Sequence, residues 1–191
     1  MTNPIVSAAW LQEHSNDSNL IVLEARLEQN QSNLENQNPD LQIKGARLFD
    51  IKNNFSDTSN PLPNTFPSEE KFTAEAQKLG INSNSTIVVY DTLGIYSSPR
   101  AWWMFKAMGH SNVFVLDGGL PEWIKKGFPT EKQLQTTYPK GNFEAKFQPD
   151  LIKNKEQILE NIATKEAVLM DARSADRFHA THEEPRAGLR S

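Results

Sequence analysis

The sequence of 191 residues contains no cysteine. This absence excludes disulfide bonds, thiolate metal ligands and any thiol chemistry performed by the chain itself. It also agrees with a cytoplasmic location, which is the location we expect.

Long runs of basic residues and of apolar residues are missing as well. The formal net charge is −4 and the longest basic run is the pair Lys125–Lys126, so a nucleic-acid partner is not expected. No apolar run approaches the roughly 20 residues of a transmembrane helix. The first residues also lack the basic and apolar regions of a signal peptide. We therefore expect a globular protein that binds neither nucleic acid nor a membrane.

Strand-like and helix-like segments alternate along most of the chain. Apolar runs typical of strands lie at 20–24, 48–49, 86–90 and 113–116, and helical patterns lie at 7–14, 68–79, 99–108 and 120–126. This alternation predicts an α/β fold, with a mainly parallel sheet covered by helices on both faces.

The beginning of this pattern occurs twice. Residues 6–26 and 153–173 each contain an amphipathic helix, a polar break and an apolar strand. The first copy ends in Glu24-Ala25-Arg26 and the second in Asp171-Ala172-Arg173. The shared order of elements predicts an internal repeat, with a second strand at about residues 168–170.

The repeat suggests a division of the chain. Residues 1–127 form a complete first domain, and residues 128–150, which contain three prolines and no long apolar period, form a linker. Residues 151–191 begin a second domain, which is too short to bury a core by itself. Apolar surface there is expected to stay exposed unless a partner covers it, either the missing C-terminal half or another chain.

Three stretches carry a family resemblance. They are FDI at 49–51, GIYSSPRAWWMFKAMGHSNVFVLDGGLPEWIKKG at 94–127 and MDARSADRFHATHEEPRAGLRS at 170–191. In these residues the chain resembles the tandem-rhodanese sulfurtransferases, closest to the bacterial 3-mercaptopyruvate branch, with thiosulfate sulfurtransferase as a near relative. The resemblance implies a three-layer rhodanese-like domain followed by an incomplete start of a second, catalytic one.

The resemblance also implies a reaction. In the family, a cysteine that follows a strand of the second domain takes sulfur from 3-mercaptopyruvate or thiosulfate as a persulfide. It then passes the sulfur to cyanide or a thiol, with no metal or other cofactor. Backbone N–H groups at a helix N-terminus stabilise such a thiolate. The chain ends before that loop, so we expect it to be inactive alone.

Arg177 and Arg186 are the candidate substrate-binding residues. Guanidinium groups bind carboxylates through two parallel hydrogen bonds. On spacing alone, both would be surface arginines paired with Glu183 and Glu184, whereas the resemblance implies that they hold the substrate. Arg173 is expected to be structural, because Arg26 stands at the same place in the first copy.

The chain departs from the family at two positions. Lys52 follows Asp50-Ile51 where an acid is common, and Asn64 stands where a histidine is common. An acid–histidine relay is therefore not expected, and the sulfur donor stays open between 3-mercaptopyruvate and thiosulfate.

Asp91 follows the strand at 86–90, where ligands bind in open α/β sheets. It is either a nucleophile of the phosphoaspartyl type or the residue that replaces the cysteine in a silent copy of the site. The acid that would help to bind Mg²⁺ is missing, since Leu93 occupies that position. The silent copy is therefore the preferred interpretation.

Two further hypotheses concern the remaining polar residues and the chain as a whole. His179 and His182, with the acids that follow, are expected to be solvated rather than to bind a metal. A non-enzymatic alternative is that the chain is a binding or regulatory module built on an inactive rhodanese domain.

Overall fold

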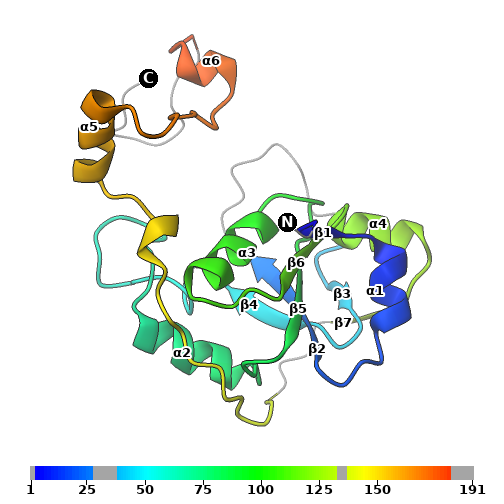
Figure 1. Cartoon of the computed structure of the whole chain (residues 1–191). Coiled ribbons are helices and arrows are strands. Elements are labelled where there is room, and N and C mark those ends of the chain that lie inside the picture. Colours follow the sequence, from blue (N-terminus) through cyan, green and yellow to red (C-terminus); the bar gives the residue numbers. More distant parts are fainter. Residues whose placement is uncertain (1–2, 28–37, 133–136, 182–191) are drawn as a thin grey trace. The chain divides into compact units, whose positions relative to one another are not determined.

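The computed structural model describes residues 3–27, 38–132 and 137–181 (Figure 1). Its contacts divide the chain into unit 1, Met1–Ile152, and unit 2, Lys153–Ser191. Among the described residues, no helix combines the length and the apolar character needed to cross a membrane.

Unit 1 is built on a five-stranded sheet with the order β1-β6-β5-β2-β4. All four strand pairs are parallel, which confirms the predicted sheet. The central strand is almost entirely buried, as expected for a parallel sheet covered on both faces. The strands are β1 (Ile5–Val6), β2 (Leu20–Arg26), β4 (Arg47–Asp50), β5 (Thr86–Tyr90) and β6 (Val113–Leu116).

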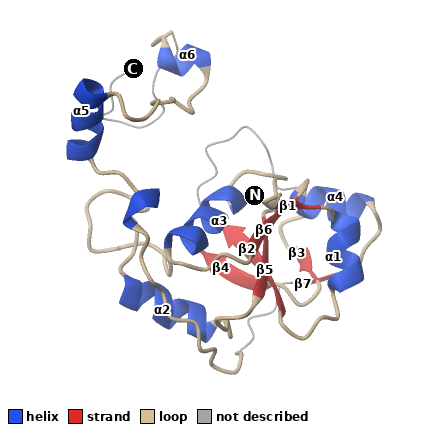
Figure 2. Cartoon of the chain, in the orientation of Figure 1, coloured by secondary structure: helices blue, strands red, loops and turns tan. Residues whose placement is uncertain are grey.

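Helices cover both faces of this sheet (Figure 2). Alternate residues of β5 enter two separate cores, Ile87 and Val89 in one and Val88 and Tyr90 in the other. The predicted three-layer α/β domain is therefore confirmed. Helices α2 (Glu69–Lys78) and α3 (Ser98–Ala107) contribute to the first core, and α1 (Ala8–His14) and α4 (Gly119–Lys125) to the second.

Local signals explain where the helices begin. The Ser7 hydroxyl accepts a hydrogen bond from the backbone N–H of Trp10, and Ser68 does the same for Lys71. Such N-caps satisfy donors that the first helical turn leaves free. The helices predicted at 7–14 and 68–79 are confirmed.

Three short strands have no counterpart in the prediction. One is β1, and the other two, β3 (Leu41–Ile43) and β7 (Thr130–Lys132), form a separate antiparallel pair. Strands of two or three residues contain too few side chains to show a period. Only contacts with distant residues reveal them.

Part of the expected linker is packed into unit 1. We call residues 137–148 the return segment. Its Phe143 is buried and contacts Phe72 and Phe105 edge to face. The backbone N–H groups of Gly141 and Phe143 donate to carbonyl oxygens of Gln77 and Ile81. The return segment thus completes the core of unit 1.

Unit 2 contains the helices α5 (Lys155–Thr164) and α6 (Ala175–Phe178). The helix predicted by the repeat is confirmed, but the strand predicted at 168–170 is wrong, because these residues have no regular secondary structure. Val168 is 87% exposed and Met170 is 88% exposed, so the predicted exposure of apolar surface is confirmed. No residue between 153 and 181 is buried.

Candidate functional site

The candidate site of unit 1 lies at the carboxyl end of the central strand. Strand β5 ends at Tyr90, and Asp91 begins a loop that runs to Ser98, the first residue of α3. We call residues 91–98 the cradle loop. The sequence predicted a site at this place, where a parallel strand meets a helix N-terminus.

The side chain of Asp91 points into its own loop and is only 2% exposed. Its Oδ2 accepts hydrogen bonds from the backbone N–H groups of Tyr96 (2.7 Å), Ser97 (3.1 Å) and Ser98 (3.0 Å). The Ser98 hydroxyl donates to the same oxygen at 2.6 Å. The Leu93 N–H donates to Oδ1 at 3.0 Å. Five donors therefore surround one carboxylate.

The hydrogen bonds of the loop engage both oxygens of the Asp91 carboxylate. Successive N–H groups that converge on one point form an anion-binding concavity, and the carboxylate of Asp91 already fills it. Both oxygens accept hydrogen bonds inside a buried loop, so neither is presented to a substrate. Among the described residues, no group of three or more metal-ligating side chains is present.

Contacts that do not involve the carboxylate hold the cradle loop in place. The Ser97 hydroxyl donates to the Ala25 carbonyl oxygen at 2.7 Å, and the Leu120 N–H donates to the Asp91 carbonyl oxygen at 3.0 Å. Gly119 permits the second contact, since a Cβ there would lie 2.5 Å from the carbonyl oxygens of Asp91 and Gly94. The Gly118–Gly119 pair of the LDGG motif thus brings α4 against the loop.

A buried polar network lies beside the cradle loop. In the register of the sheet Glu24 pairs with Tyr90, and the Tyr90 hydroxyl donates to Glu24 Oε2 at 3.3 Å. Arg26 donates to Glu24 Oε1 at 2.6 Å. Burial, together with the charge of Glu24, raises the pKa of Tyr90, so the phenol remains a donor. The network joins the ends of β2 and β5.

The sequence pattern alone does not indicate that Tyr90 belongs to this network. A signal was present, since Glu24 interrupts the apolar run of β2 at the same edge of the sheet. Its partner, however, is set by the strand register.

Arg100 extends from the first turn of α3 to the loop that precedes α2. Its guanidinium donates to the backbone carbonyl oxygen of Asn64 and lies 5.8 Å from the Trp103 ring centroid. Burial lowers the pKa of Arg100. Arg100 therefore ties the loop at Asn64 to the first turn of α3.

The structure places one of the two predicted substrate-binding arginines. Arg177 lies in α6 of unit 2 and is half-buried, whereas Arg186 and His182 lie outside the described residues. Arg173 pairs with Asp171, with its Nη2 2.8 Å from Asp171 Oδ2. The acid-Ala-Arg sequence therefore makes the same internal ion pair in unit 2 as Arg26 makes with Glu24 in unit 1.

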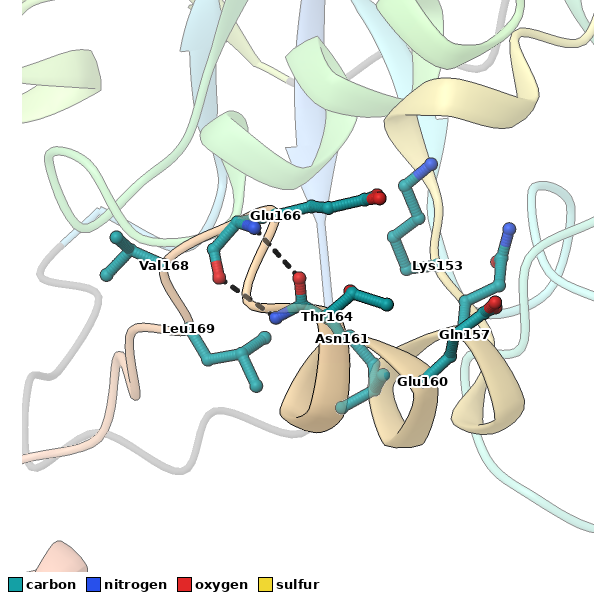
Figure 3. Close-up of a pocket in the computed structure, with 10 residues that line it drawn as sticks. Lys153, Gln157, Glu160, Asn161, Thr164, Glu166, Val168 and Leu169 are labelled. Atoms are coloured by element: carbon teal, nitrogen blue, oxygen red, sulfur yellow. Dashed lines mark hydrogen bonds between the residues drawn. The ribbon is translucent and has the colours of Figure 1, made fainter.

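Unit 2 contains a pocket of about 380 Å³ between α5 and the segment that follows it (Figure 3). The Asn161 carboxamide holds the segment that forms one wall of this pocket. Its Oδ1 accepts a hydrogen bond from the Ala167 N–H at 2.8 Å, and its Nδ2 donates to the Ala167 carbonyl oxygen at 2.9 Å. The lining residues include charged and amide side chains from α5 and the apolar Val168 and Leu169. None of them is buried, so the pocket lacks the convergent buried polar groups of a ligand site.

These features define a class of protein: a three-layer α/β domain with an anion-holding loop after its central parallel strand. The Rhodanese-like domain family matches residues 7–126 of the chain. The chain therefore belongs to the rhodanese family.

Individual relatives agree with this assignment. The chain is 35% identical over 192 residues to 3-mercaptopyruvate sulfurtransferase of Escherichia coli K12, covering 99% of the chain and 68% of that protein. It is 36% identical over 211 residues to thiosulfate/3-mercaptopyruvate sulfurtransferase 2 of Arabidopsis thaliana, covering 98% of the chain but only 61% of that protein. The chain thus spans less than two thirds of this relative's length.

Solved structures show the same fold. The crystal structure of SseA from Escherichia coli, whose title describes the rhodanese fold of 3-mercaptopyruvate sulfotransferases, matches with a TM-score of 0.83 at 34% identity. The match covers 98% of the chain and 72% of SseA. Tum1 of Saccharomyces cerevisiae matches with a TM-score of 0.85 at 26% identity, covering 99% of the chain and 66% of Tum1.

Proposed function

We propose that the chain is the N-terminal part of a two-domain sulfurtransferase, with a non-catalytic first domain and the start of the catalytic domain from residue 151. The observation that carries this proposal is the filled cradle. Asp91 is the residue that the family resemblance aligns with the catalytic cysteine, and its carboxylate occupies all the converging donors. The chain has no cysteine to perform the reaction elsewhere.

The proposed reaction of the whole protein proceeds through a cysteine persulfide. Sulfur passes from 3-mercaptopyruvate or thiosulfate to the cysteine, and then to cyanide or a thiol, without a cofactor. The names of the relatives support both donors, since some name 3-mercaptopyruvate and others thiosulfate. On this proposal the 191-residue chain is inactive alone.

The test compares the 191-residue chain with the product of the reading frame continued past Ser191. Both are assayed for thiocyanate formation from thiosulfate and cyanide, and for sulfur transfer from 3-mercaptopyruvate to a thiol. We expect activity only in the longer product. Activity of the 191-residue chain, or a longer product without a cysteine-containing loop, would contradict the proposal.

Arg177 and Arg186 are the proposed substrate-binding residues of the longer product. If their guanidinium groups hold the carboxylate of 3-mercaptopyruvate, Arg177→Lys and Arg186→Lys should each raise its KM by about tenfold, since lysine cannot form the bidentate pair. Arg173→Lys is the matched control, because Arg173 pairs with Asp171. An equal rise in the control would show that the effect is structural.

A second candidate function is a binding or regulatory module. The exposed Val168 and Met170 favour it, because apolar side chains gathered on a surface mark an interaction site. On this alternative, another chain covers residues 151–191; in the enzyme, the missing C-terminal half does. Amide hydrogen exchange of residues 153–181 distinguishes these two functions. If the protein is the enzyme, these amides should be protected from exchange in the longer product without any added protein.

We also propose a cytoplasmic location. One relative from Arabidopsis thaliana is mitochondrial by name, so the location differs within the family. Fractionation of the source cells tests the proposal, and recovery in an organelle or membrane fraction would contradict it.

A further inference from the structure

We propose that unit 1 contains a binding site for a small aromatic carboxylate, separate from the cradle loop. The site is a pocket of about 380 Å³ between α1, α4 and the turn that follows β3, and this volume is typical of a site for a small ligand. None of the residues that line it belongs to the cradle loop. A ligand there is therefore independent of sulfur transfer and of the proposed function.

The floor of this pocket is fixed in the second core. Leu11, Ile43 and Trp123 line it, and each of them is at most 2% exposed. They come from α1, β3 and α4, which pack together on one side of unit 1 (Figure 1). The pocket of unit 2, by contrast, has no buried residue in its lining. A floor held by the core keeps its shape before a ligand arrives, as in most small-molecule sites.

The turn after β3 forms a wall that hydrogen bonds hold in place. The Pro129 carbonyl oxygen accepts from the Lys44 N–H at 3.3 Å and from the Trp123 indole N–H at 2.9 Å. The Gly45 N–H donates to Glu131 Oε1 at 2.9 Å. These bonds fix the backbone of the turn and do not use the ammonium group of Lys44, which stays available to a ligand.

The polar side chains of the lining indicate the charge of the ligand. Among the described residues that line the pocket, Lys44 is the only charged one. It makes no ion pair within the described part of the chain. The carboxamides of Gln12 and Asn16, which also line the pocket, make no hydrogen bond there either. One ammonium group and two amide donors, with no acid among the described lining residues, are complementary to a carboxylate.

The apolar part of the lining indicates the body of the ligand. Trp123 contributes an indole ring, Pro129 contributes a pyrrolidine ring, and Val22 of β2 is half-buried beside them. An aromatic ring packs well against such surfaces because it buries a large apolar area with little loss of conformational freedom. A ligand of one or two fused rings, with its carboxylate at Lys44, therefore matches both parts of the pocket.

The test uses 2-naphthoate as the probe and 2-naphthamide as its uncharged counterpart. NMR chemical shifts of the ¹⁵N-labelled 191-residue chain are followed as each probe is added. We expect saturable shifts of the Gly45 amide and of the Trp123 indole N–H, with a Kd of about 1 mM or below for 2-naphthoate. The uncharged probe should bind at least about threefold more weakly, because it cannot pair with the ammonium group. Shifts that do not saturate, or equal affinity of the two probes, overturn the proposal.

Lys44→Gln removes the charge from the pocket and should weaken 2-naphthoate binding by at least about threefold, with no change for 2-naphthamide. Lys132→Gln is the matched control, because Lys132 is exposed on β7, the partner strand of β3, and does not line the pocket. We expect this control to change neither affinity. Equal effects of the two substitutions on 2-naphthoate binding overturn the proposal.

Val22→Phe tests the place of the aromatic ring. The larger side chain occupies the pocket, so both probes should lose their saturable shifts. A folded Val22→Phe chain that binds 2-naphthoate as tightly as the unmodified chain overturns the proposal. If this variant does not fold, the comparison of Lys44→Gln with Lys132→Gln decides by itself, because both of those lysines are exposed.

Discussion

Asp91 carries a buried charge that depends on the donors of its own loop. Three of its hydrogen bonds come from the consecutive N–H groups of Tyr96, Ser97 and Ser98; those of Ser97 and Ser98, at the N-terminus of α3, have no partner within the helix. The carboxylate and the helix therefore satisfy each other. This mutual dependence makes the position sensitive to the loss of one oxygen.

Asp91→Asn should lower the free energy of unfolding by about 1–3 kcal/mol, since the amide NH₂ must face donors on one side of the loop. Denaturant unfolding measures the change. Asp117→Asn is the matched control, because Asp117 also follows a parallel strand but is exposed. We expect its change to stay within about 0.5 kcal/mol. Equal losses would show that the cradle contributes nothing special.

His110 makes the stability of unit 1 depend on pH. It is 3% exposed, its Nε2 lies 2.9 Å from the Ser85 carbonyl oxygen, and it packs between Phe105 and Phe143. Burial lowers the pKa of His110, and the charge of Lys106 acts in the same direction. The folded chain therefore favours the neutral ring.

Because the unfolded chain binds the proton more readily, the unfolding free energy should fall as the pH drops below about 6.5, the usual histidine pKa. Above that pH the ring is neutral in both states and contributes no slope. His110→Gln retains a donor for Ser85 without titrating. Denaturant unfolding between pH 5 and 8 should show a smaller acid loss in the variant, and parallel curves would contradict the assignment.

At the scale of elements, the return segment shows how a stretch without its own periodicity joins a core. Only glycine fits at position 141, because a Cβ there would lie 2.0 Å from the Ile81 carbonyl oxygen. This close approach allows the backbone of the return segment to form hydrogen bonds with α2 and with the turn that follows it. Phe143 then closes the core beside Phe72.

Phe143→Ala should destabilise unit 1 by about 3–5 kcal/mol, because it removes a fully buried ring and leaves a cavity. Phe147→Ala is the control on the same segment. Phe147 is 38% exposed, so its truncation should cost much less. Thermal and denaturant unfolding compare the two variants, and equal effects would show that the return segment is not part of the core.

At the scale of the whole molecule, the two units differ in how much they bury. Unit 1 has two cores that close around its sheet, while no residue between 153 and 181 is buried. A stable fold requires burial, so unit 1 accounts for the stability of the chain.

Truncation after Ile152 should therefore change the unfolding free energy of unit 1 by less than about 1 kcal/mol. Truncation after Gly127, the end of the first domain predicted from the sequence, removes Phe143 and should destabilise the chain strongly. Unfolding of both fragments against the full chain measures this. If the shorter fragment were as stable as the longer one, the domain boundary would lie at residue 127.

Much of unit 1 follows from the sequence alone. The apolar runs determine the strands at 20–24, 86–90 and 113–116, and the helical patterns at 7–14 and 68–79 determine where α1 and α2 lie. An acid directly after a buried strand determines where the site lies. These signals are local, because they depend on side-chain period and on hydrogen bonds within one helical turn.

Tertiary structure decided the rest. The strand predicted at 168–170 does not form, because the backbone of a strand requires a neighbouring strand for its hydrogen bonds. Tyr90 meets Glu24 only through the sheet register, and Phe143 enters the core only because distant helices receive it. The cradle is the clearest case: the sequence determined that Asp91 follows β5, but only the folded loop, tied to β2 and α4, decided that five donors converge on its carboxylate. Such contacts join residues far apart in the chain, and no local pattern encodes them.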